Sequence, residues 1–592
     1  MAIENLITDH LDLWTAAVRP KSSVGRGSNS KLELTGIKKL RELILELAVR
    51  GKLVPQDPSD EPASVLLERI AAEKTRLVKE KKTKKEKPLP AISENEKPFE
   101  LPQGWEWCHL KDIITIMDAG WSPACPPEAS PDIDTWGVLK TTAVQTLEYR
   151  EYENKVLDKT KTPRPEYEVM VGDILITRAG PKNRVGISCL VEKTRPKLMI
   201  SDKIIRFHLV EVGLSERFIS LCLNAGATAV YIDGSKSGMA ESQMNISQDK
   251  LKLAPIPLGP LKEQNHIMDR VDELMALCDQ LEQRSESQLT AHQTLVEALL
   301  ATLTDSTDAD ELAQNWARLS SHFDTLFTTE ASIDALKQSI LQLAVMGKLV
   351  PQDPSDEPAS ALLERIAAEK AQLVKEKKIK KEKLLPAISE NEKPFELPQG
   401  WACCRISDLG YDLGGGTPSK TKNKFWNGNI PWVSPKDMKV DFISSSTDYV
   451  TEDAISETVI KLIPSNSLLM VVRGMILAHS FPVALTMAPV TINQDMKALV
   501  FSEINEVYLL TLMKAARERV VSMVEHSSHG TCKLVSEKLW SMVVCIPPKE
   551  EQLRVIKTVD TLMTICGQLK SRLQTSQQTH LKLVDSLVEQ AF

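Results

Sequence analysis

Three residues near the C-terminal third of the chain have the types and spacing of a metal site. His526, His529 and Cys532 form an H-x-x-H-x-x-C pattern, and imidazole and thiolate groups are preferred ligands of Zn²⁺. The Ser, Gly and Thr residues between them are typical of a loop, and no fourth ligand lies nearby in sequence. We therefore do not predict a metal ion here.

The glycine-rich run Gly414–Lys420 could approach a phosphate, but Pro418 has no N–H to donate to one. The chain has no G-x-x-x-x-G-K-[ST] loop, no G-x-G-x-x-G after a strand and no Asn/Asp-Pro-Pro-aromatic tetrapeptide of amino-methyltransferases. No nucleophile and base can be paired from their spacing. The sequence thus predicts no catalytic residues, no metal and no cofactor site in this chain.

Composition sets the class of protein. The chain has 592 residues, of which 42% are hydrophobic and 26% charged, as expected for several globular domains. Its formal net charge of −7 means that any DNA binding must use local basic patches. The ten cysteines are scattered without a CxxC pair, so we expect no disulfide bonds. Without a signal sequence or a long apolar stretch, we expect a cytoplasmic chain that does not contact membranes.

The elements that must position any functional residues are duplicated. Residues 47–105 recur as residues 343–401, at a constant offset of 296 and with six differences. After each copy comes a segment of about 150 residues, and these two segments are dissimilar, with short β-rich runs separated by Gly, Pro and Asp. A near-identical scaffold with two different inserts suggests one frame that carries two different readers.

Helical patterns define the scaffold. Leu40, Leu43, Ile44, Leu47 and Ala48 form the apolar stripe of an amphipathic helix. A second helix is predicted after Pro62, with Leu66, Ile70 and Leu77 on one side. It ends in the basic run 79–87, repeated at 375–383, which either contacts phosphates or is a solvated helix end.

Each insert is followed by a long helix with apolar residues at alternating steps of four and three, a heptad seam typical of a coiled coil. Its polar members, His292 and His580, either fix the alignment of the helices or are partly exposed positions. We expect the seam to pack helices against each other or against other subunits through Leu274, Leu281, His292, Leu295, Leu562, Leu569, His580 and Leu583.

These features resemble the specificity (S) subunits of Type I restriction–modification systems over nearly the whole chain. The resemblance rests on Leu-Pro-Gln-Gly-Trp at 101–105 and 397–401, on the run 414–438, and on Pro-Pro-x-x-Glu-Gln at 547–552. The first insert is less typical, since it ends in Pro-Leu-Gly-Pro at 257–260. The long segment before residue 101, with its central duplicate, resembles one subgroup of the family.

The resemblance implies an α/β (α+β) fold: two mixed α/β target-recognition domains separated by long antiparallel coiled-coil helices. It divides the chain into an N-terminal arm (1–31), a first conserved helical region (32–100), target-recognition domain 1 (101–260), a central conserved helical region (261–396), target-recognition domain 2 (397–548) and a C-terminal conserved helix (549–592).

The same resemblance implies a non-catalytic DNA reader of a bipartite, asymmetric double-stranded site. In the family, two methyltransferase (M) subunits methylate adenine N6, and two restriction/translocase (R) subunits complete a complex that cuts unmodified DNA. S-adenosylmethionine, ATP and Mg²⁺ belong to those partners. Two other classes remain open: an enzyme acting alone, which would need the motifs found absent above, and a coiled-coil scaffold without sequence reading, which leaves the dissimilar inserts unexplained.

We expect the DNA contacts in basic and polar loops of the two inserts, because Lys and Arg bind phosphates and Arg also reads guanine. For any single residue, an ordinary surface cation is the alternative. The candidates are Lys140, Thr141, Arg178, Lys182, Asn183 and Arg184 in the first insert, and Lys420, Lys422, Lys424, Ser434, Lys436 and Arg473 in the second.

Overall fold

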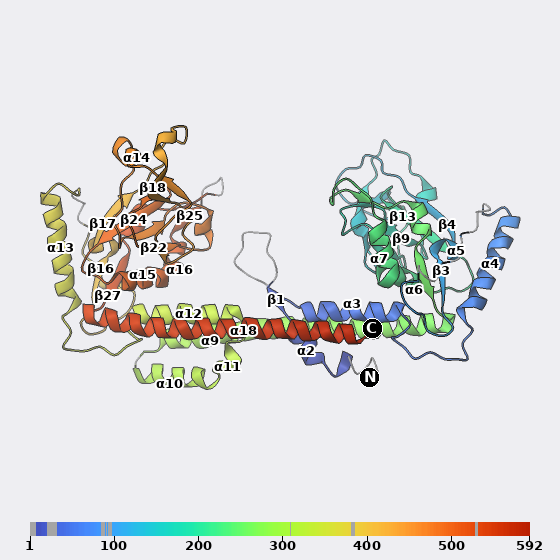
Figure 1. Ribbon diagram of the computed structural model, residues 1–592, viewed down its shortest axis with the longest axis horizontal. Coiled ribbons are helices and arrows are strands. Elements are labelled where there is room, and N and C mark those ends of the chain that lie inside the picture. Colours follow the sequence, from blue (N-terminus) through green and yellow to red (C-terminus); the bar gives the residue numbers. More distant parts are fainter. Residues whose placement is uncertain are drawn as a thin grey trace. The chain divides into compact units, whose positions relative to one another are not determined.

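The computed structural model describes residues 7–20, 32–83, 89, 92, 97–307, 309–380, 385–526 and 531–592. Most of the predicted N-terminal arm and the ends of both basic runs lie outside the described residues. The chain forms two compact units: the first contains residues 32–286 and 577–592, and the second contains residues 287–576. Two long helices, α9 (Leu261–Asp305) and α18 (Lys549–Gln590), contribute one part to each unit (Figure 1).

The first unit is a mixed α/β domain on a helical base. Its four-stranded sheet has the order β11-β9-β13-β4, and a three-stranded sheet has the order β12-β5-β8. The helices are α2 (Leu11–Ala16), α3 (Thr35–Val49), α4 (Ala63–Lys79), α5 (Leu110–Ile113), α6 (Glu216–Asn224), α7 (Gly226–Ser235) and α8 (Gln248–Lys252). The strands are β1 (Arg19–Pro20), β2 (Leu32–Glu33), β3 (Glu106–His109), β4 (Ile114–Ala119), β5 (Gly137–Leu139), β6 (Val144–Gln145), β7 (Glu148–Tyr149), β8 (Asn154–Val156), β9 (Ile174–Thr177), β10 (Ala179–Gly180), β11 (Ser188–Leu190), β12 (Leu198–Met199), β13 (Ile204–Leu209), β14 (Met244–Asn245) and β15 (Pro255–Leu258).

The second unit has the same plan with a larger sheet. A five-stranded sheet has the order β17-β24-β21-β22-β19, and a three-stranded sheet has the order β20-β18-β23. The helices are α10 (Ala309–Ser321), α11 (Phe323–Leu326), α12 (Glu330–Val345), α13 (Ala359–Lys375), α14 (Glu452–Glu457), α15 (Glu506–Ala515), α16 (Arg517–Ser522) and α17 (Ser536–Trp540). The strands are β16 (Ala402–Arg405), β17 (Gly410–Gly414), β18 (Trp426–Val433), β19 (Phe442–Ile443), β20 (Asp448–Val450), β21 (Leu468–Val471), β22 (Val483–Thr486), β23 (Thr491–Ile492), β24 (Met496–Phe501), β25 (Val524–His526), β26 (Cys532–Leu534) and β27 (Val543–Ile546).

The apolar stripes of the scaffold helices are buried as predicted. Leu40, Leu43, Ile44, Leu47 and Ala48 on α3 are all buried, which confirms the predicted amphipathic helix. Removing such side chains from water drives the helix onto its base, at about 25 cal/mol per Å² of apolar surface. None of the helices in the described part of the chain combines the length and apolar composition that a membrane crossing needs.

Contacts along α3 and α12 give the direction of the long helices inside each unit. In the first unit, α3 runs parallel to the end of α18 and opposite to α9, through Lys39–Asp585, Lys52–Phe592 (3.3 Å), Arg41–Asp279 (2.7 Å) and Gln56–Glu263 (3.2 Å). In the second, α12 runs parallel to α9 and opposite to α18, through His292–Thr325 (3.2 Å), Lys348–Thr304 (2.8 Å), Lys570–Glu330 (3.0 Å) and Gln352–Glu551 (3.2 Å). In both units the long helices are therefore antiparallel, which confirms the expected fold class.

Two positions of the predicted seam do not pack inside this chain. Leu295 and Leu583 are about half exposed, at 51% and 48%, whereas the next residues, Val296 and Val584, are buried. Along α9, the side chains on the buried side recur ten times in the 36 residues from Ile267 to Leu303, so their mean spacing is about 3.6 residues. A straight α-helix has about 3.6 residues per turn, whereas a strict heptad repeat has about 3.5. Over several turns the buried positions therefore fall one residue later than the heptad predicts.

The other seam positions are covered to different degrees. Leu274 is buried, and Leu281, His292, Leu562, Leu569 and His580 are half-buried. A ring nitrogen of His292 lies 3.2 Å from the carbonyl oxygen of Thr325, so this side chain contacts the segment after α11.

Each domain is attached to its long helix by a buried junction. The Leu-Pro-Gln-Gly-Trp motif ends in Trp105, whose indole Nε1 donates to Glu263 Oε2 at 2.9 Å near the start of α9. In the second unit Trp401 donates to Glu551 Oε1 at 3.1 Å near the start of α18. Burial raises the pKa of both carboxyl groups, Glu263 and Glu551. The duplicated sequence thus supplies the tryptophan, and the Glu-Gln pair that opens each long helix supplies its partner.

The packing at this junction requires glycine. Gly51 has a φ of +65°, and a Cβ there would lie 2.6 Å from the ring of Trp105. Gly347, with a φ of +72°, faces Trp401 in the same way. Glycine adopts this backbone conformation freely and leaves room for the indole ring, so each tryptophan packs directly on the chain that leaves the preceding helix.

Changing Glu551 tests the junction. We expect Glu551→Ala to destabilise the second unit by about 1–3 kcal/mol, because the indole N–H of Trp401 loses its buried acceptor. Glu551→Gln should lose less, since it keeps one acceptor oxygen and removes a buried charge. A raised folded pKa means that stability falls as pH rises from the unfolded to the folded value. The native chain should therefore gain stability between pH 7 and pH 5, and the Gln variant should not share that gain.

Denaturant midpoints measured at both pH values on the whole chain would check this, with the matching Glu263 variants as a parallel series in the first unit. Equal losses for the Ala and Gln variants at pH 7 would contradict it.

The expectation of no disulfide was wrong. Cys403 and Cys545 stand opposite each other on the antiparallel strands β16 and β27, and their sulfur atoms are bonded. The residues are 142 positions apart in sequence, so composition and spacing could not pair them. Strand register brings them together.

Candidate nucleic-acid interface

The end of each domain that lies away from its long helix can be located from the direction of the strands. In the first unit, β13 leads toward Ser215, whose backbone N–H donates to Gln264 of α9 at 3.3 Å. The start of β13 is therefore the end far from α9, and β9 pairs antiparallel with it. We call this end of the sheet the distal end.

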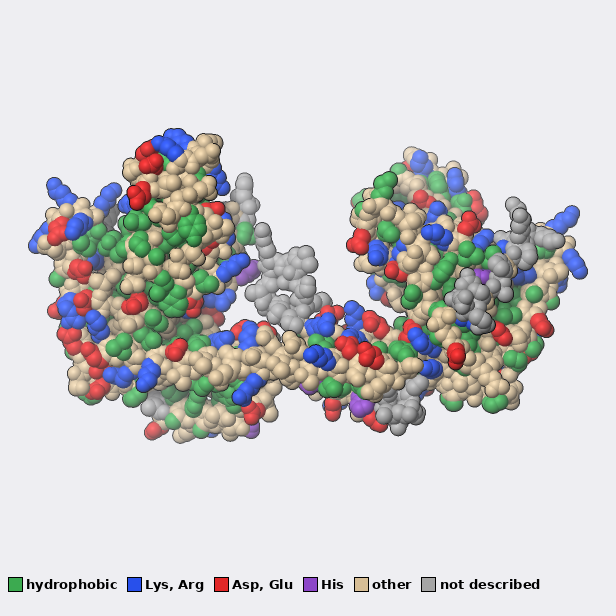
Figure 2. Space-filling view, in the orientation of Figure 1, with side chains coloured by type: hydrophobic (Ala, Val, Ile, Leu, Met, Phe, Trp, Pro, Cys, Tyr) green, Lys and Arg blue, Asp and Glu red, His purple; other side chains and the backbone are tan. Residues whose placement is uncertain are grey.

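The second unit is built in the same way. Strand β24 leads toward Asn505, whose N–H donates to Gln552 of α18 at 2.9 Å. Asp495, just before β24, therefore lies at the distal end, together with the end of the antiparallel strand β21. Lys and Arg side chains lie among acidic ones over this end of each domain, each taken by itself (Figure 2).

Two of the predicted DNA-binding residues occupy equivalent places at the distal ends. Arg178 follows β9, and its N–H donates to the carbonyl oxygen of Lys203 at 2.7 Å, just before β13. Arg473 follows β21, and its N–H donates to the carbonyl oxygen of Asp495 at 3.2 Å, just before β24. The two arginines thus extend from the same point of the shared plan.

The two arginines have different neighbours. No described residue forms a hydrogen bond or ion pair with the guanidinium of Arg178, which is half-buried beside exposed Lys203. Arg473 is exposed, and its Nη1 lies 4.0 Å from Asp495 Oδ1. At 4.0 Å this ion pair is weak, so a stronger acceptor such as a phosphate or a guanine edge can replace it.

The other candidates of the first insert are less uniform. Asn183 is exposed, whereas Lys182 lies 3.8 Å from Glu241 and Lys140 lies 3.8 Å from Glu153. Thr141 begins a short 3-10 turn and is half-buried. These side chains are accessible cations and polar groups with weak internal contacts.

Arg184 is a correction. Its guanidinium donates to Gln145 Oε1 at 2.9 Å and to the carbonyl oxygens of Thr141 and Val144 at 2.8 and 2.7 Å. Burial lowers its pKa. The side chain therefore holds the turn before β6 to the loop after β9, and we do not retain it as a DNA contact.

The second insert presents three lysines in the loop before β18. Lys420 is exposed and has no side-chain partner among the described residues. Lys422 lies 5.5 Å from the ring centre of Phe425, and Lys424 pairs with Glu457 at 2.6 Å. Lys436, after β18, pairs with Asp448 at 2.8 Å.

Ser434 is the second correction, since it is buried and its Oγ donates to Asp437 Oδ2 at 2.8 Å. Burial disfavours the ionised Asp437, but hydrogen bonds from Thr447 and Ser434 outweigh it and lower the pKa of this carboxyl group. Ser434 therefore belongs to a structural turn after β18.

The sequence analysis missed several groups at the distal ends. In the first unit these are exposed Lys203 and the ring of Trp121, which lies 4.3 Å under the guanidinium of Arg164. In the second they are exposed Gln494, which accepts from Thr417 Oγ1 at 2.5 Å, and Lys533, which faces Arg473 in a β-bridge. Lys203 stands directly before a β-rich run of the sequence, and that position was the signal that could have identified it.

The structure describes only two residues of the considered metal pattern. His526 and Cys532 pair across the β25–β26 hairpin, with the sulfur 3.4 Å from His526 Nδ1, and His529 lies outside the described residues. Within the described ranges, no group of three or more His, Cys, Asp or Glu side chains is placed to hold a metal ion.

Comparisons with known proteins agree with the repeated plan. The model of the Type I restriction modification DNA specificity domain matches residues 102–291 and again residues 398–576. The chain is 42% identical to the EcoEI specificity subunit of a Type I restriction enzyme from Escherichia coli over 617 aligned residues, and 42% identical to the EcoAI specificity subunit from the same species over 626. Both matches cover 100% of each chain.

Among solved structures, the HsdS subunit from Thermoanaerobacter tengcongensis is 14% identical with a TM-score of 0.40, over 84% of this chain and 99% of that one. Two family matches on one chain, together with relatives aligned over its whole length, identify its family. The chain belongs to the specificity subunits of Type I restriction–modification systems.

Proposed function

We propose that this chain is the DNA sequence-recognition subunit of a Type I restriction–modification complex. Each domain reads one half of a bipartite, asymmetric site in double-stranded DNA, and the chain itself catalyses no reaction. It directs two M subunits to methylate adenine N6 and two R subunits to restrict unmodified DNA in the cytoplasm. S-adenosylmethionine, ATP and Mg²⁺ act in those partners.

The observation that carries this proposal is the equivalent position of Arg178 and Arg473 at the two distal ends. A guanidinium that extends from a rigid strand end can donate two hydrogen bonds to guanine O6 and N7 in the major groove. Around the two arginines the side chains differ, with Lys203 in one domain where Asp495 stands in the other. A shared position with different surroundings suits two readers of different sequences.

A coiled-coil assembly scaffold without sequence reading is the alternative. It accounts for the long helices and the duplicated junctions but leaves the two distal ends without a role. Purified M subunits should bind DNA without sequence preference when this chain is omitted, and should regain the preference when it is added. Unchanged sequence preference without the chain would support the scaffold.

Truncation of the two arginines tests the reading residues. Arg178→Ala and Arg473→Ala should each weaken binding to the native site by about 1–3 kcal/mol and relax one base position in one half-site. A phosphate contact would instead weaken binding to all sequences and lower its salt dependence. Binding to a library of sites at several salt concentrations separates these results.

Matched controls are Arg69→Ala and Arg365→Ala, since these exposed arginines occupy equivalent places on α4 and α13 and pair with Glu61 and Glu357. They remove the same charge without touching a distal end and should leave the recognised sequence unchanged. Unchanged binding of the Arg178 and Arg473 variants at every salt concentration would remove both from the interface.

A further inference from the structure

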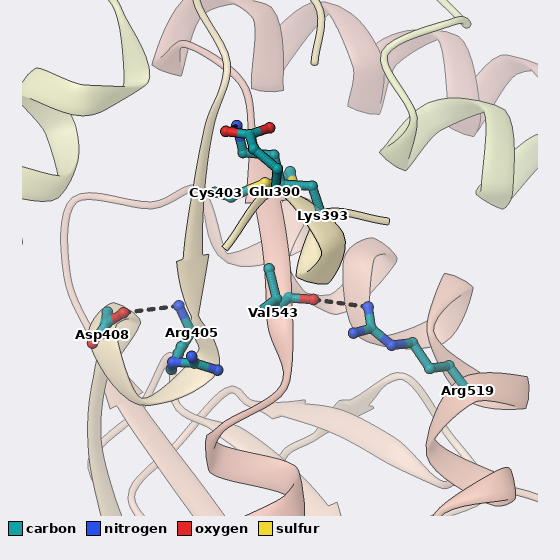
Figure 3. The surroundings of a disulfide bond; sticks show 8 residues. Glu390, Lys393, Cys403, Arg405, Asp408, Arg519 and Val543 are labelled. Atoms are coloured by element: carbon teal, nitrogen blue, oxygen red, sulfur yellow. Dashed lines mark hydrogen bonds and ion pairs between the residues drawn. A yellow bond between two sulfur atoms is a disulfide. The ribbon is translucent and has the colours of Figure 1, made fainter. Parts of the chain in front are cut away.

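The disulfide joins the first and last strands of the second domain. Cys403 lies on β16 and Cys545 on β27, which form their own two-stranded sheet. Figure 3 shows the surroundings of the bond at Cys403. In the first unit the equivalent strands, β3 and β15, pair Trp107 with Pro257 at this register. The shared plan therefore closes without a sulfur bridge in the first unit.

The two sulfur atoms differ in access. Cys545 is buried, whereas Cys403 is half-buried and lines a cavity of about 720 Å³ between α13 and the start of β16. A cavity of this size accepts a small molecule. Its walls include residues 385–388 and the apolar side chains of Leu363, Ala367 and Val374. Cys403 and the buried Cys404 are among the residues that line this cavity, whereas Cys545 is not.

Positive side chains also line this cavity. Arg405 is buried, and its Nη2 pairs with Glu392 Oε1 at 3.1 Å, while Asp408 adds a carboxyl group to the lining. Lys380 is exposed at the rim, and Lys370 donates to the carbonyl oxygen of Ser407 at 2.6 Å. With Lys370, Lys380 and Arg405 against Asp408, the lining carries more positive than negative side chains, which favours an anionic thiol over a cationic one.

We propose that Cys403 is a site of thiol–disulfide exchange with an anionic low-molecular-weight thiol of the glutathione type. The thiolate of the small molecule attacks Cys403 Sγ, a new S–S bond forms, and the bond to Cys545 breaks. Cys545 leaves as a thiolate and takes a proton from water. A second small thiolate then attacks the sulfur of the first, which releases the Cys403 thiolate and the oxidised small disulfide. In the reverse direction the small disulfide is the oxidant.

The neighbouring thiols do not compete. Cys404 lies next in sequence, but it is fully buried and burial raises its pKa far above the usual value. Of the eight other cysteines, all of which the structure describes, Cys125 alone is not buried. A thiol of the chain could attack the disulfide only if it were accessible and ionised, and Cys404 is neither. The small thiol is therefore the attacking group, and Cys403 is the sulfur that it attacks.

Exchange changes the second domain and leaves the first as it was. Without the bridge, no covalent bond joins β16 to β27, just as none joins β3 to β15. Local opening of these two strands then becomes easier, because the bridge no longer ties residues that are 142 positions apart. The redox state of the small-thiol pool thereby acts on one reader only.

The test uses the full chain purified in air, incubated with reduced glutathione, blocked with N-ethylmaleimide and analysed by peptide mass spectrometry. We expect a Cys403–Cys545 crosslink before treatment, then a glutathione mixed disulfide on the Cys403 peptide and a blocked thiol on the Cys545 peptide. Cysteamine, a cationic thiol of similar reactivity, should react at least several-fold more slowly. A mixed disulfide on Cys545, or an absent crosslink before treatment, would overturn the proposal.

Three variants and one exchange measurement complete the test. In Cys545→Ser, oxidised glutathione should modify Cys403, whereas in Cys403→Ser it should leave Cys545 unmodified, and Cys125→Ser supplies the background from an accessible thiol elsewhere. In the unsubstituted chain, reduction should speed amide hydrogen exchange in β16 and β27 at least tenfold and leave β3 and β15 unchanged. Equal exchange in β16 and β27 before and after reduction would exclude a structural effect of the bridge.

Discussion

Exchanging the first domain for that of a relative is expected to change one half of the methylated site completely. The other half and the spacer should stay as they were. The reason is that the first domain makes its own sheets and its own core, and its reading residues lie at its own distal end. Nothing in the second domain has to change with it.

The structure shows where to cut the chain. An exchange of residues 103–257 would end inside β15. Exchange of residues 106–258 instead keeps β3 and β15 together and leaves Trp105, Gly259 and Glu263 in their native junction. The incoming domain needs a glycine where Gly226 has a φ of +63°, since a Cβ there would lie 2.5 Å from Val49 of α3.

Mapping N6-methyladenine across the genome of a host that carries the chimera, with its M subunits, gives the result. A matching exchange of residues 402–546 in the second domain is the control and should alter only the opposite half-site. If either chimera changed both halves of the site, independent reading by the two domains would be wrong.

Lengthening both long helices is expected to lengthen the spacer between unchanged half-sites. Seven residues add about 10.5 Å to a helix, or roughly three base pairs at about 3.4 Å each. They make nearly two full turns at about 3.6 residues per turn, so the apolar seam stays almost in phase. We propose on this basis that the helices act as the ruler of the bipartite site.

The insertion has to avoid the contacts of the scaffold helices. Sites after Leu281 and Leu569 would displace Glu282 and Lys570, which pair with Arg41 and Glu330. Insertion after Glu286 in α9 and after Ser576 in α18, where each helix passes from one unit to the other, leaves these pairs intact.

Methylation mapping again gives the readout, and an insertion in α9 alone is the control, because unequal helices cannot keep both seams packed. A longer spacer with both half-sites unchanged is the expected result. Altered half-sites with the native spacer would show that the helices do not set the distance.

The sequence by itself determined the scaffold of this protein. Residues 47–105 recur as 343–401, and each copy ends in a tryptophan that forms the same junction in the structure. The apolar stripe of α3 predicted its buried face. Such patterns are local, because burial on one face of a helix requires apolar residues at a fixed period. The family likeness rested in part on the same duplicated segment, through Leu-Pro-Gln-Gly-Trp at 101–105 and 397–401.

Tertiary structure alone decided which polar side chains are available for binding. Arg178 and Arg184 are basic residues six positions apart after β9. The guanidinium of Arg178 has no described partner, whereas that of Arg184 donates to the carbonyl oxygens of Thr141 and Val144. The long helices follow a straight period, so Val296 and Val584 are buried in place of Leu295 and Leu583. The register of β16 and β27 brought Cys403 to Cys545. These outcomes depend on contacts between residues far apart in sequence, which no local pattern encodes.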